Sequence, residues 1–175
     1  VGNTSDITLA QALEATTIGL IGDTVTINDA LTADRLEVTA ASGLTQSANG
    51  DLDVADLRVR GTAAVDLDQA SNTIDLWQLR GSTSQLASLD LQTTGDIAIG
   101  GTAAEPLRST GAVTIETTTG NIDVDSAVVS DSTQPEAITI NAGRDKTAGD
   151  VDGGDIRLAA GAAFTVGSGG QVHLF

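Results

Sequence analysis

The chain contains 175 residues, of which 40% are hydrophobic, enough to form the core of one ordinary domain. Its 24 acidic residues outnumber 8 basic ones, and the formal net charge of −16 excludes nucleic acid as a partner and disfavours an anionic membrane surface. The sequence has no cysteine, which excludes disulfides and thiol chemistry.

The hydrophobic residues are almost all small or aliphatic, since Trp77, Phe164 and Phe175 are the only aromatic residues. Wide, irregular interiors are usually filled by several aromatic side chains, whereas a thin and regular core suits aliphatic ones. The sequence contains no run of 18 apolar residues, so it predicts no membrane-spanning helix. Residues 1–6 lack the basic and apolar regions of a signal peptide.

Residues 1–49 carry short aliphatic alternations at irregular spacing, such as Ile7-Thr8-Leu9. Within this region, residues 10–15 predict a loop or a short helix, because isolated helices of this length are marginal. We interpret 1–49 as the less regular start of a repeat protein, which is common at the ends of solenoids.

From residue 50 onward the sequence repeats one phrase, a glycine with Asp or Asn followed by two aliphatic residues that flank a third residue. The copies begin at Gly50, Gly95, Gly120 and Gly154, and a looser copy without glycine begins at Asn72. Glycine beside Asp or Asn favours tight turns and positive φ, and the alternation places both aliphatic side chains on one face of a strand. A unit that recurs roughly every 20 to 25 residues is typical of a solenoid.

Each repeat also contains a second aliphatic pair, 13 to 16 residues after the first, and several repeats contain a third cluster such as Leu57 with Val59. Three short strands per turn is the geometry of a parallel β-helix, in which every strand pairs with its counterpart one coil away. We therefore predict an all-β, right-handed parallel β-helix (a solenoid) of about seven coils with three short strands per coil. The first pairs are Leu52/Val54, Ile74/Leu76, Ile97/Ile99, Ile122/Val124 and Ile156/Leu158, and the second pairs are Val65/Leu67, Leu89/Leu91, Val113/Ile115, Ile138/Ile140 and Val172/Leu174.

Two alternatives to this alignment stay open at the level of sequence. An offset of 20 aligns Leu57, Trp77 and Ile97 and gives the same architecture with different partners. An antiparallel β-sandwich is the structural rival, although its turns rarely recur at a fixed period with the same residues.

We expect residues 1–175 to form a single β-helix segment of a longer chain, with regular coils over 50–175. The last residues, Leu174 and Phe175, directly follow a strand phrase without a polar cap, which would leave a sheet edge exposed. The polar stretch 144–153 lengthens the last repeat, and insertions in a solenoid are extruded from its wall, so we expect an exposed loop there.

One group of acidic residues and arginines has the composition of a polysaccharide-cleaving site. Paired carboxylates perform glycoside hydrolysis, and a lyase combines calcium-binding carboxylates with an arginine. These residues alternate with inward aliphatics, however, and no aromatic platform for sugar rings accompanies them. We therefore favour solvated outward side chains and expect no catalytic, cofactor-binding or metal-binding residues. The group comprises Asp51, Asp53, Asp56, Arg58 and Arg60, with Arg80 placed one coil beyond Arg58 by the preferred alignment, and Asp66, Asp68 and Asp75 nearby.

Asp150, Asp152 and Asp155 match the calcium-binding repeat of a β-roll only once and imperfectly, so a polar loop is favoured. His173 is the sole histidine, and its position between two aliphatic residues predicts an outward ring. Trp77 is expected to cover a core edge or a corner between strands.

A row of outward threonines would be typical of an ice-binding solenoid. Thr8, Thr26, Thr114 and Thr139 occupy such positions. Other coils are expected to interrupt the row with charged or small residues, so ice binding is disfavoured. The interrupting residues in this alignment are Asp53, Asp75, Ala98 and Arg157.

The repeated phrases, together with the stretch from Gly153 through Ile156 to Gly170 and Val172, resemble the filamentous-haemagglutinin-type exoproteins of bacteria, which are two-partner-secretion adhesins. The resemblance covers roughly residues 50–175. It implies a large, repetitive, right-handed β-helical adhesin that is exported through an outer-membrane partner. No match to the N-terminal secretion domain of that family is found in the sequence.

We therefore expect a non-catalytic structural or adhesive rod from a secreted or cell-surface bacterial protein, without a cofactor. Its partner would be a host or neighbouring-cell surface or an extracellular polysaccharide. A carbohydrate-active β-helix, either a lyase or a hydrolase, is the alternative, and a deep groove with convergent Asp and Arg side chains would favour it. A third possibility is a self-assembling extracellular fibre subunit that associates end to end.

Overall fold

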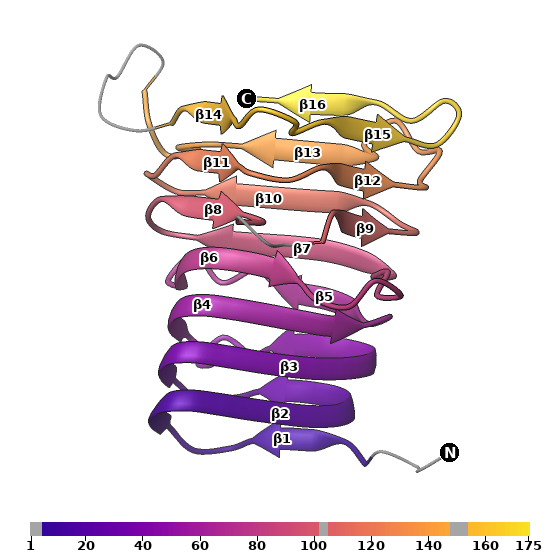
Figure 1. The fold of residues 1–175 in the computed structure, drawn as a ribbon. Coiled ribbons are helices and arrows are strands. Elements are labelled where there is room, and N and C mark those ends of the chain that lie inside the picture. Colours follow the sequence, from indigo (N-terminus) through magenta and orange to yellow (C-terminus); the bar gives the residue numbers. More distant parts are fainter. Residues whose placement is uncertain (1–4, 102–104, 148–153) are drawn as a thin grey trace.

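The computed structural model describes residues 5–101, 105–147 and 154–175. These residues form a parallel β-helix, a stack of coils that rises from the N-terminal strand to the C-terminal one (Figure 1). The ladders between strands are parallel, which confirms the predicted fold class. The described part of the chain contains no helix, and therefore none that could cross a membrane. The strands are β1 (Ile7–Leu9), β2 (Leu13–Ile27), β3 (Leu31–Gln46), β4 (Leu52–Gly61), β5 (Ala64–Leu67), β6 (Thr73–Leu79), β7 (Ser88–Thr93), β8 (Ile97–Ile99), β9 (Leu107–Ser109), β10 (Val113–Thr117), β11 (Ile122–Val124), β12 (Val128–Ser130), β13 (Ile138–Asn141), β14 (Ile156–Leu158), β15 (Phe164–Val166) and β16 (Val172–Leu174).

The strands form three walls. Wall A consists of the first halves of β2 and β3 followed by β4, β6, β8, β11 and β14. Wall B consists of β1, the second halves of β2 and β3, and then β5, β7, β10, β13 and β16. Wall C consists of β9, β12 and β15. The last coils therefore have the expected three short strands, whereas β2 and β3 continue around a corner and join walls A and B.

The first quarter of the chain contains the longest strands rather than the least regular ones. Strands β2 and β3 have 15 and 16 residues and pair with each other along almost their whole length, with one register shift between Gly22 and Thr24. The helix considered for residues 10–15 does not form, because β2 begins at Leu13. Alternating burial from Ile18 to Ile27 explains why this stretch is extended.

The predicted pairing of wall B is confirmed throughout. Val113 pairs with Leu89 on one side and with Ile138 on the other, and Ile138 pairs with Val172. The later part of wall A is confirmed as well, since Ile122 pairs with both Ile97 and Ile156. Ile122 is fully buried while its neighbour Asp123 faces outward, as the alternation of a strand requires.

The predicted pairing in the earlier part of wall A is wrong. Val54 pairs with Ile74, and Leu57 pairs with Trp77, so this coil has the offset of 20 that the alternative alignment proposed. The next coil matches neither alignment. Trp77 pairs with Ile99, whereas the preferred alignment paired Ile74 with Ile97 and the alternative paired Trp77 with Ile97. Leu76, predicted to point inward, is only half-buried and lies in the outward column beside Ala98.

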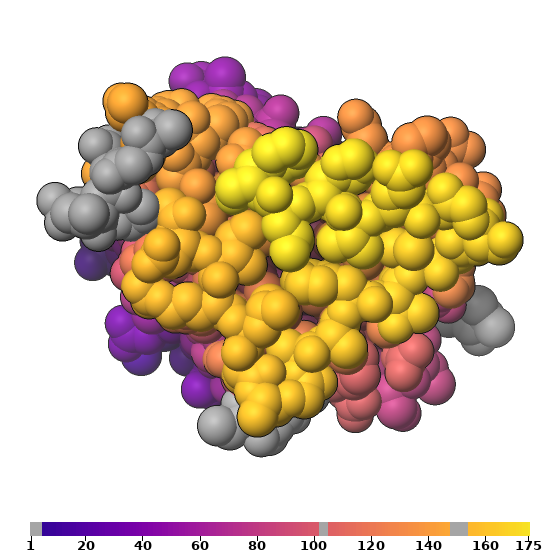
Figure 2. Space-filling view, turned by 90° about the horizontal axis from the view of Figure 1, so that it is seen from above, coloured from indigo at the N-terminus to yellow at the C-terminus, as the bar shows by residue number. Residues whose placement is uncertain are grey.

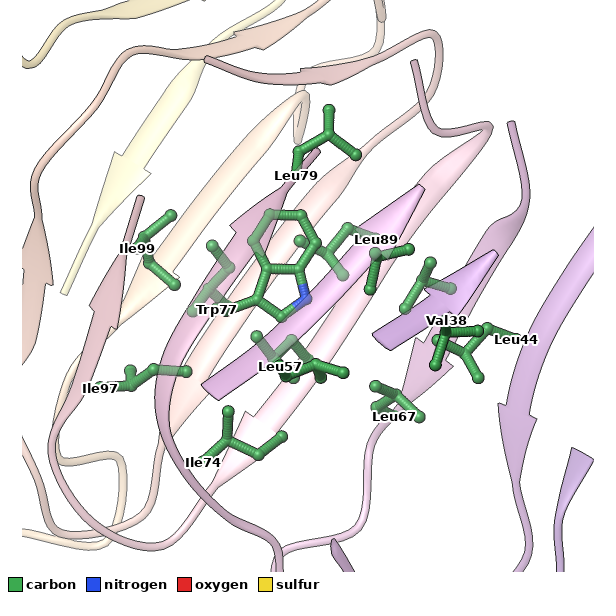
Figure 3. Close-up of a cluster of buried hydrophobic side chains, with 14 of the residues drawn as sticks. Val38, Leu44, Leu57, Leu67, Ile74, Trp77, Leu79, Leu89, Ile97 and Ile99 are labelled. Carbon is green, nitrogen blue, oxygen red and sulfur yellow. The ribbon is translucent and has the colours of Figure 1, made fainter. Parts of the chain in front are cut away.

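Trp77 fills the core instead of covering an edge, which corrects the expectation from the sequence. Its side chain is only 1% exposed. Figure 3 shows the indole between Leu57 and Leu79 of wall A, with Leu89 of wall B among the side chains behind it. The single tryptophan therefore joins two walls in the middle of the stack.

Two glycines of the repeated phrase, Gly50 and Gly120, are required by close approach between coils and not by a positive φ. Among the four copies, only Gly154 has a positive φ, of 87°. A Cβ atom on Gly50 would lie 2.1 Å from the carbonyl oxygen of Ile27, and one on Gly120 would lie 2.1 Å from the carbonyl carbon of Gly95. Any side chain at these two corners would collide with the backbone of the coil before.

Asn72, the copy without glycine, is buried and organises a polar corner. Its side-chain oxygen accepts hydrogen bonds from the Leu52 backbone N–H and the Gln46 amide at 3.0 and 2.9 Å. Its side-chain nitrogen donates to the Gln46 side-chain oxygen and to the backbone carbonyls of Leu67 and Gln92. One amide side chain thus satisfies backbone groups of β4, β5 and β7.

The insertion at 144–153 begins as part of the wall. The backbone N–H of Arg144 donates to the Thr117 carbonyl at 2.8 Å, and its guanidinium lies 2.8 Å from the Glu116 carboxylate. The expected exposed loop otherwise falls on residues 148–153, which lie outside the described residues together with Asp150 and Asp152.

Candidate binding surface on wall A

The outward side chains of wall A come from consecutive rungs that the register brings side by side. Strand alternation turns every second residue of β3 and β4 away from the core. Arg35 pairs with Asp56, and Glu37 pairs with Arg58, so opposite charges face each other across the two strands. The sequence predicted that Asp56 and Arg58 would lie close together, but not that β3 supplies their partners.

These four residues form an ion-pair network. The Asp56 carboxylate lies 2.7 Å from Arg58 and 3.3 Å from Arg35, and Arg58 also lies 3.4 Å from Glu37. The Arg58 side chain is 24% exposed, so two carboxylates hold its guanidinium against the wall. The two positive and two negative charges balance, and the network is electrically neutral as a group.

Further along the strands, the wall becomes basic. Thr39 pairs with Arg60, and the N–H of Arg80 donates to the Val59 carbonyl, so Arg80 follows Arg60 on the next rung. The expectation that Arg80 lies one coil beyond Arg58 is therefore wrong: Arg58 faces Gln78. The Arg80 guanidinium donates to the Gln78 side-chain oxygen.

A hollow of about 220 Å³ opens beside this basic end, and we call it the arginine hollow. Gly19 leaves it open, because a Cβ at this position would meet no atom within 4 Å. Ile21 contributes an apolar side chain that is 67% exposed. The remaining lining residues are Glu37, Val38, Thr39, Arg58 and Arg60.

A second, larger hollow of about 510 Å³ lies over the other half of the same strands and is acidic. Successive strands contribute Glu14, Asp34, Asp53 and Asp75 to its lining, together with small residues and threonines. This hollow brings together Asp53 and Asp75, two of the acids singled out in the sequence. No group of three or more metal-ligating side chains capable of holding an ion is found in the described ranges.

Asp66 lies in β5 of wall B and Asp68 directly follows that strand, so neither belongs to wall A. Asp66 pairs with Asp90 on the next rung. Burial raises the pKa of Asp90 above its ordinary value, and the neighbouring charges of Asp66, Asp68 and Glu116 raise it further. Burial followed by the charge of Asp68 raises the pKa of Asp66. Neither carboxylate lines one of the two hollows.

The other predicted positions have local partners. Asp51 accepts a hydrogen bond from the Ser71 hydroxyl, and Asp155 accepts one from Arg157 at 3.2 Å. His173 points outward as predicted, with its Nε2 3.1 Å from the Pro135 carbonyl oxygen and its ring stacked on Phe175.

The row of outward threonines is more continuous than the alignment of the repeats indicated. Thr8 pairs with Thr26, which pairs with Thr45, and Thr114 pairs with Thr139. The expected interruptions, such as Asp53, lie on wall A instead. The row is interrupted on wall B by Asp66 and Asp90 between Thr45 and Thr114.

The candidate-site residues that the sequence analysis did not single out lie in the first quarter of the chain. Glu14, Gly19, Ile21 and Asp34 line the two hollows, and Arg35 belongs to the ion-pair network. The available signal was the run Arg35-Leu36-Glu37, in which charged residues flank an aliphatic one. Comparisons with family models, curated proteins and solved structures find nothing that matches this chain.

Proposed function

We propose that this chain is a non-catalytic structural and adhesive rod segment of a secreted or cell-surface bacterial protein, which displays binding surfaces away from the cell. The observation that carries this proposal is the uninterrupted aliphatic interior. The wall B column is buried on every rung from the second to the seventh, with each side chain at most 2% exposed. Its members are Val25, Leu44, Val65, Leu89, Val113 and Ile138.

Such an interior favours a rod because every coil is stabilised by the coils on either side of it. Stability then adds along the axis, and the length of the rod is not limited by the volume of one core. The walls remain available for side chains that contact a partner. The experiment is to attach the purified chain to beads and to measure bead adhesion to bacterial and host-cell surfaces. Adhesion above that of beads coated with an unrelated acidic protein supports the proposal, and its absence on all surfaces would count against it.

A filamentous-haemagglutinin-type origin, with export through an outer-membrane partner, remains part of the proposal. The repeated glycine phrases support it, and so does the parallel β-helical fold, which that family is expected to share. The test is to join the family's secretion domain to this chain and express the fusion with and without the partner. Partner-dependent appearance of the fusion outside the cell is the expected result.

The acidic hollow favours one competing function, a carbohydrate-active β-helix. Asp53 and Asp75 both line it, which satisfies the minimum requirement of two carboxylates. Asp66 and Asp90, whose pKa values are raised, lie on another wall and cannot serve as proton donors in this hollow. Turnover of an acidic or neutral polysaccharide, with or without calcium, that is lost in Asp53→Asn would establish the enzyme instead.

The C-terminal coil favours end-to-end association. Figure 2 views the stack from this end, where Leu158, Leu174 and Phe175 are 51%, 48% and 66% exposed. An apolar sheet edge of this kind pairs with another edge, either of a second copy or of further coils. Sedimentation at increasing concentration tests the first case, and Leu174→Lys should then abolish association.

A further inference from the structure

We propose that the arginine hollow binds the carboxylate of a single acidic sugar, a hexuronate unit, within a polysaccharide whose other units are neutral. This inference rests on the proposed adhesive function and specifies the partner of one displayed surface. The lining of the hollow supports it. Arg58 is held there by ion pairs, whereas Arg60 forms none among the described residues. Ile21 adds an exposed aliphatic side chain, and Gly19 leaves the hollow open.

The first element is the positive charge of Arg60. Arg58 is neutralised by Asp56 and Glu37, but none of the ion pairs among residues 5–101, 105–147 and 154–175 involves Arg60. A guanidinium presents a planar fork of donors that matches a carboxylate, and such charge-assisted pairs are the stronger kind of hydrogen bond. Arg60 is therefore the residue on which a ligand carboxylate would lie.

The second element is the shape and polarity of the rest of the hollow. At about 220 Å³ it is smaller than a typical pocket for a drug-sized ligand, and it suits one ring rather than a long groove-bound chain. Ile21 offers an apolar contact to the C–H face of a sugar ring. The Thr39 hydroxyl and the Glu37 carboxylate offer hydrogen-bond partners to ring hydroxyls.

The third element is the surrounding charge, which selects against a ligand with carboxylates on every unit. The same wall carries Glu14, Asp34, Asp53 and Asp75 in the acidic hollow, and the whole chain has a net charge of −16. A second carboxylate on an adjacent sugar would approach these acids and be repelled. Neutral sugars beside the bound hexuronate avoid that repulsion.

The experiment follows backbone amide shifts of the ¹⁵N-labelled full chain by NMR during titration with three probes. They are a hyaluronan tetrasaccharide, in which glucuronate alternates with a neutral sugar, its carboxyl-reduced counterpart, and an oligogalacturonate of equal length. We expect saturable shifts at Gly19, Thr39 and Arg60 with the first probe, at least tenfold weaker binding of the second, and weaker binding of the third. Equal binding of the carboxyl-reduced probe would overturn the proposal.

Two variants and one matched control locate the site. Arg60→Gln removes the guanidinium and should weaken hyaluronan binding about tenfold or more. Gly19→Val fills the hollow without changing charge and should abolish binding, since open space surrounds Gly19. Arg108→Gln removes another exposed arginine, from wall C, and should leave binding unchanged. Melting temperatures confirm that each variant folds.

Other outcomes are decided by the same titrations. If Arg108→Gln weakens binding as much as Arg60→Gln, the attraction is general charge and the proposal fails. If a leucine-ended peptide binds at Gly19 and Arg60 while the sugar does not, the hollow is a peptide site and the proposal also fails. Failure of the sugar titration with intact bead adhesion would reject this site alone, whereas loss of adhesion altogether would reject the proposed function.

Discussion

Asp66 lies beside Asp90 on adjacent rungs of wall B, so two carboxylates neighbour each other in a parallel ladder. On either side of them the ladder continues with threonine, since Thr45 pairs with Asp66 and Thr114 pairs with Asp90. Like charges directly opposite each other destabilise a sheet. The two acids therefore mark a local weak point in a column that carries threonine on the neighbouring rungs.

Replacing Asp90 with threonine should stabilise the protein at neutral pH. The pKa of Asp90 is raised above its ordinary value of 3.8 by burial and by Asp66, Asp68 and Glu116. The folded state therefore binds the proton more tightly than the unfolded state, and stability is lost as pH rises from below 3.8 through the raised pKa. We expect Asp90→Thr to raise the Tm at pH 7 by about 1 to 3 °C and to leave it nearly unchanged well below the ordinary pKa.

Thermal unfolding across this pH range checks the expectation. Asp125→Asn, which removes the same charge from an exposed residue directly after β11, is the control. An equal gain in both variants would mean that the benefit comes from lower net charge and not from the Asp66–Asp90 pair.

Gly120 and Gly95 provide a matched pair for the close approach between coils. A Cβ on Gly120 would lie 2.1 Å from the Gly95 carbonyl carbon, whereas a Cβ on Gly95 would meet nothing within 4 Å. Gly120→Ala should therefore lower the free energy of unfolding by about 2 kcal/mol or more. Gly95→Ala should leave it unchanged or slightly raised. Urea unfolding of both variants measures the difference, and equal costs would contradict the steric argument.

Trp77 is expected to dominate the packing in the middle of the stack. Its side chain is 1% exposed and packs against both wall A and wall B. Trp77→Ala should cost about 3 to 5 kcal/mol, and Trp77→Phe considerably less. The indole Nε1 has no hydrogen-bond partner among the described residues, so Phe removes a buried unsatisfied donor as well as volume. Circular dichroism should follow the unfolding, since both variants lack the only tryptophan fluorophore.

Asn72→Ala should be costly despite the small change in volume. The amide satisfies the Leu52 N–H and the carbonyls of Leu67 and Gln92, all of which would lose that partner inside the corner. We expect a loss of about 2 to 4 kcal/mol in the free energy of unfolding. Asn141→Ala removes one side-chain hydrogen bond of 3.3 Å to Glu116 and should cost under about 1 kcal/mol. Similar losses in both variants would refute the role assigned to Asn72.

The fold was predictable because the inward aliphatic residues recur in pairs on nearly every coil. Wall B could be aligned from Val65 onward, since Leu89, Val113 and Ile138 follow one another at almost constant spacing. Wall A could not, because Asn72 replaces the corner glycine and Trp77 takes the inward position that the pattern assigned to Leu76. When the Asn72 side chain takes the place of a glycine at the corner, the residue offset between paired strands changes, although the sequence shows no insertion or deletion there.

The candidate site was predictable only in part, for a related reason. Arg58 and Arg60 were recognisable from their own strand, but their partners Glu37 and Thr39 come from the preceding coil. The register decides which residues of neighbouring coils lie side by side. The register of the early strands of wall A, β3, β4 and β6, could not be derived from the repeats. Gly19 contributes to the hollow by lacking a side chain, which no charge or motif pattern reveals.

The spacing between paired residues has a consequence for how the chain reaches its final form. Ile7 pairs with Val25, 18 residues later, and even the longest step, from Val128 to Phe164, spans only 36. A coil can therefore close as soon as the next few dozen residues become available, without waiting for the other end of the polypeptide. Assembly from one end is thus open to a chain that emerges gradually from a ribosome or a pore, each finished coil serving as the template for the next.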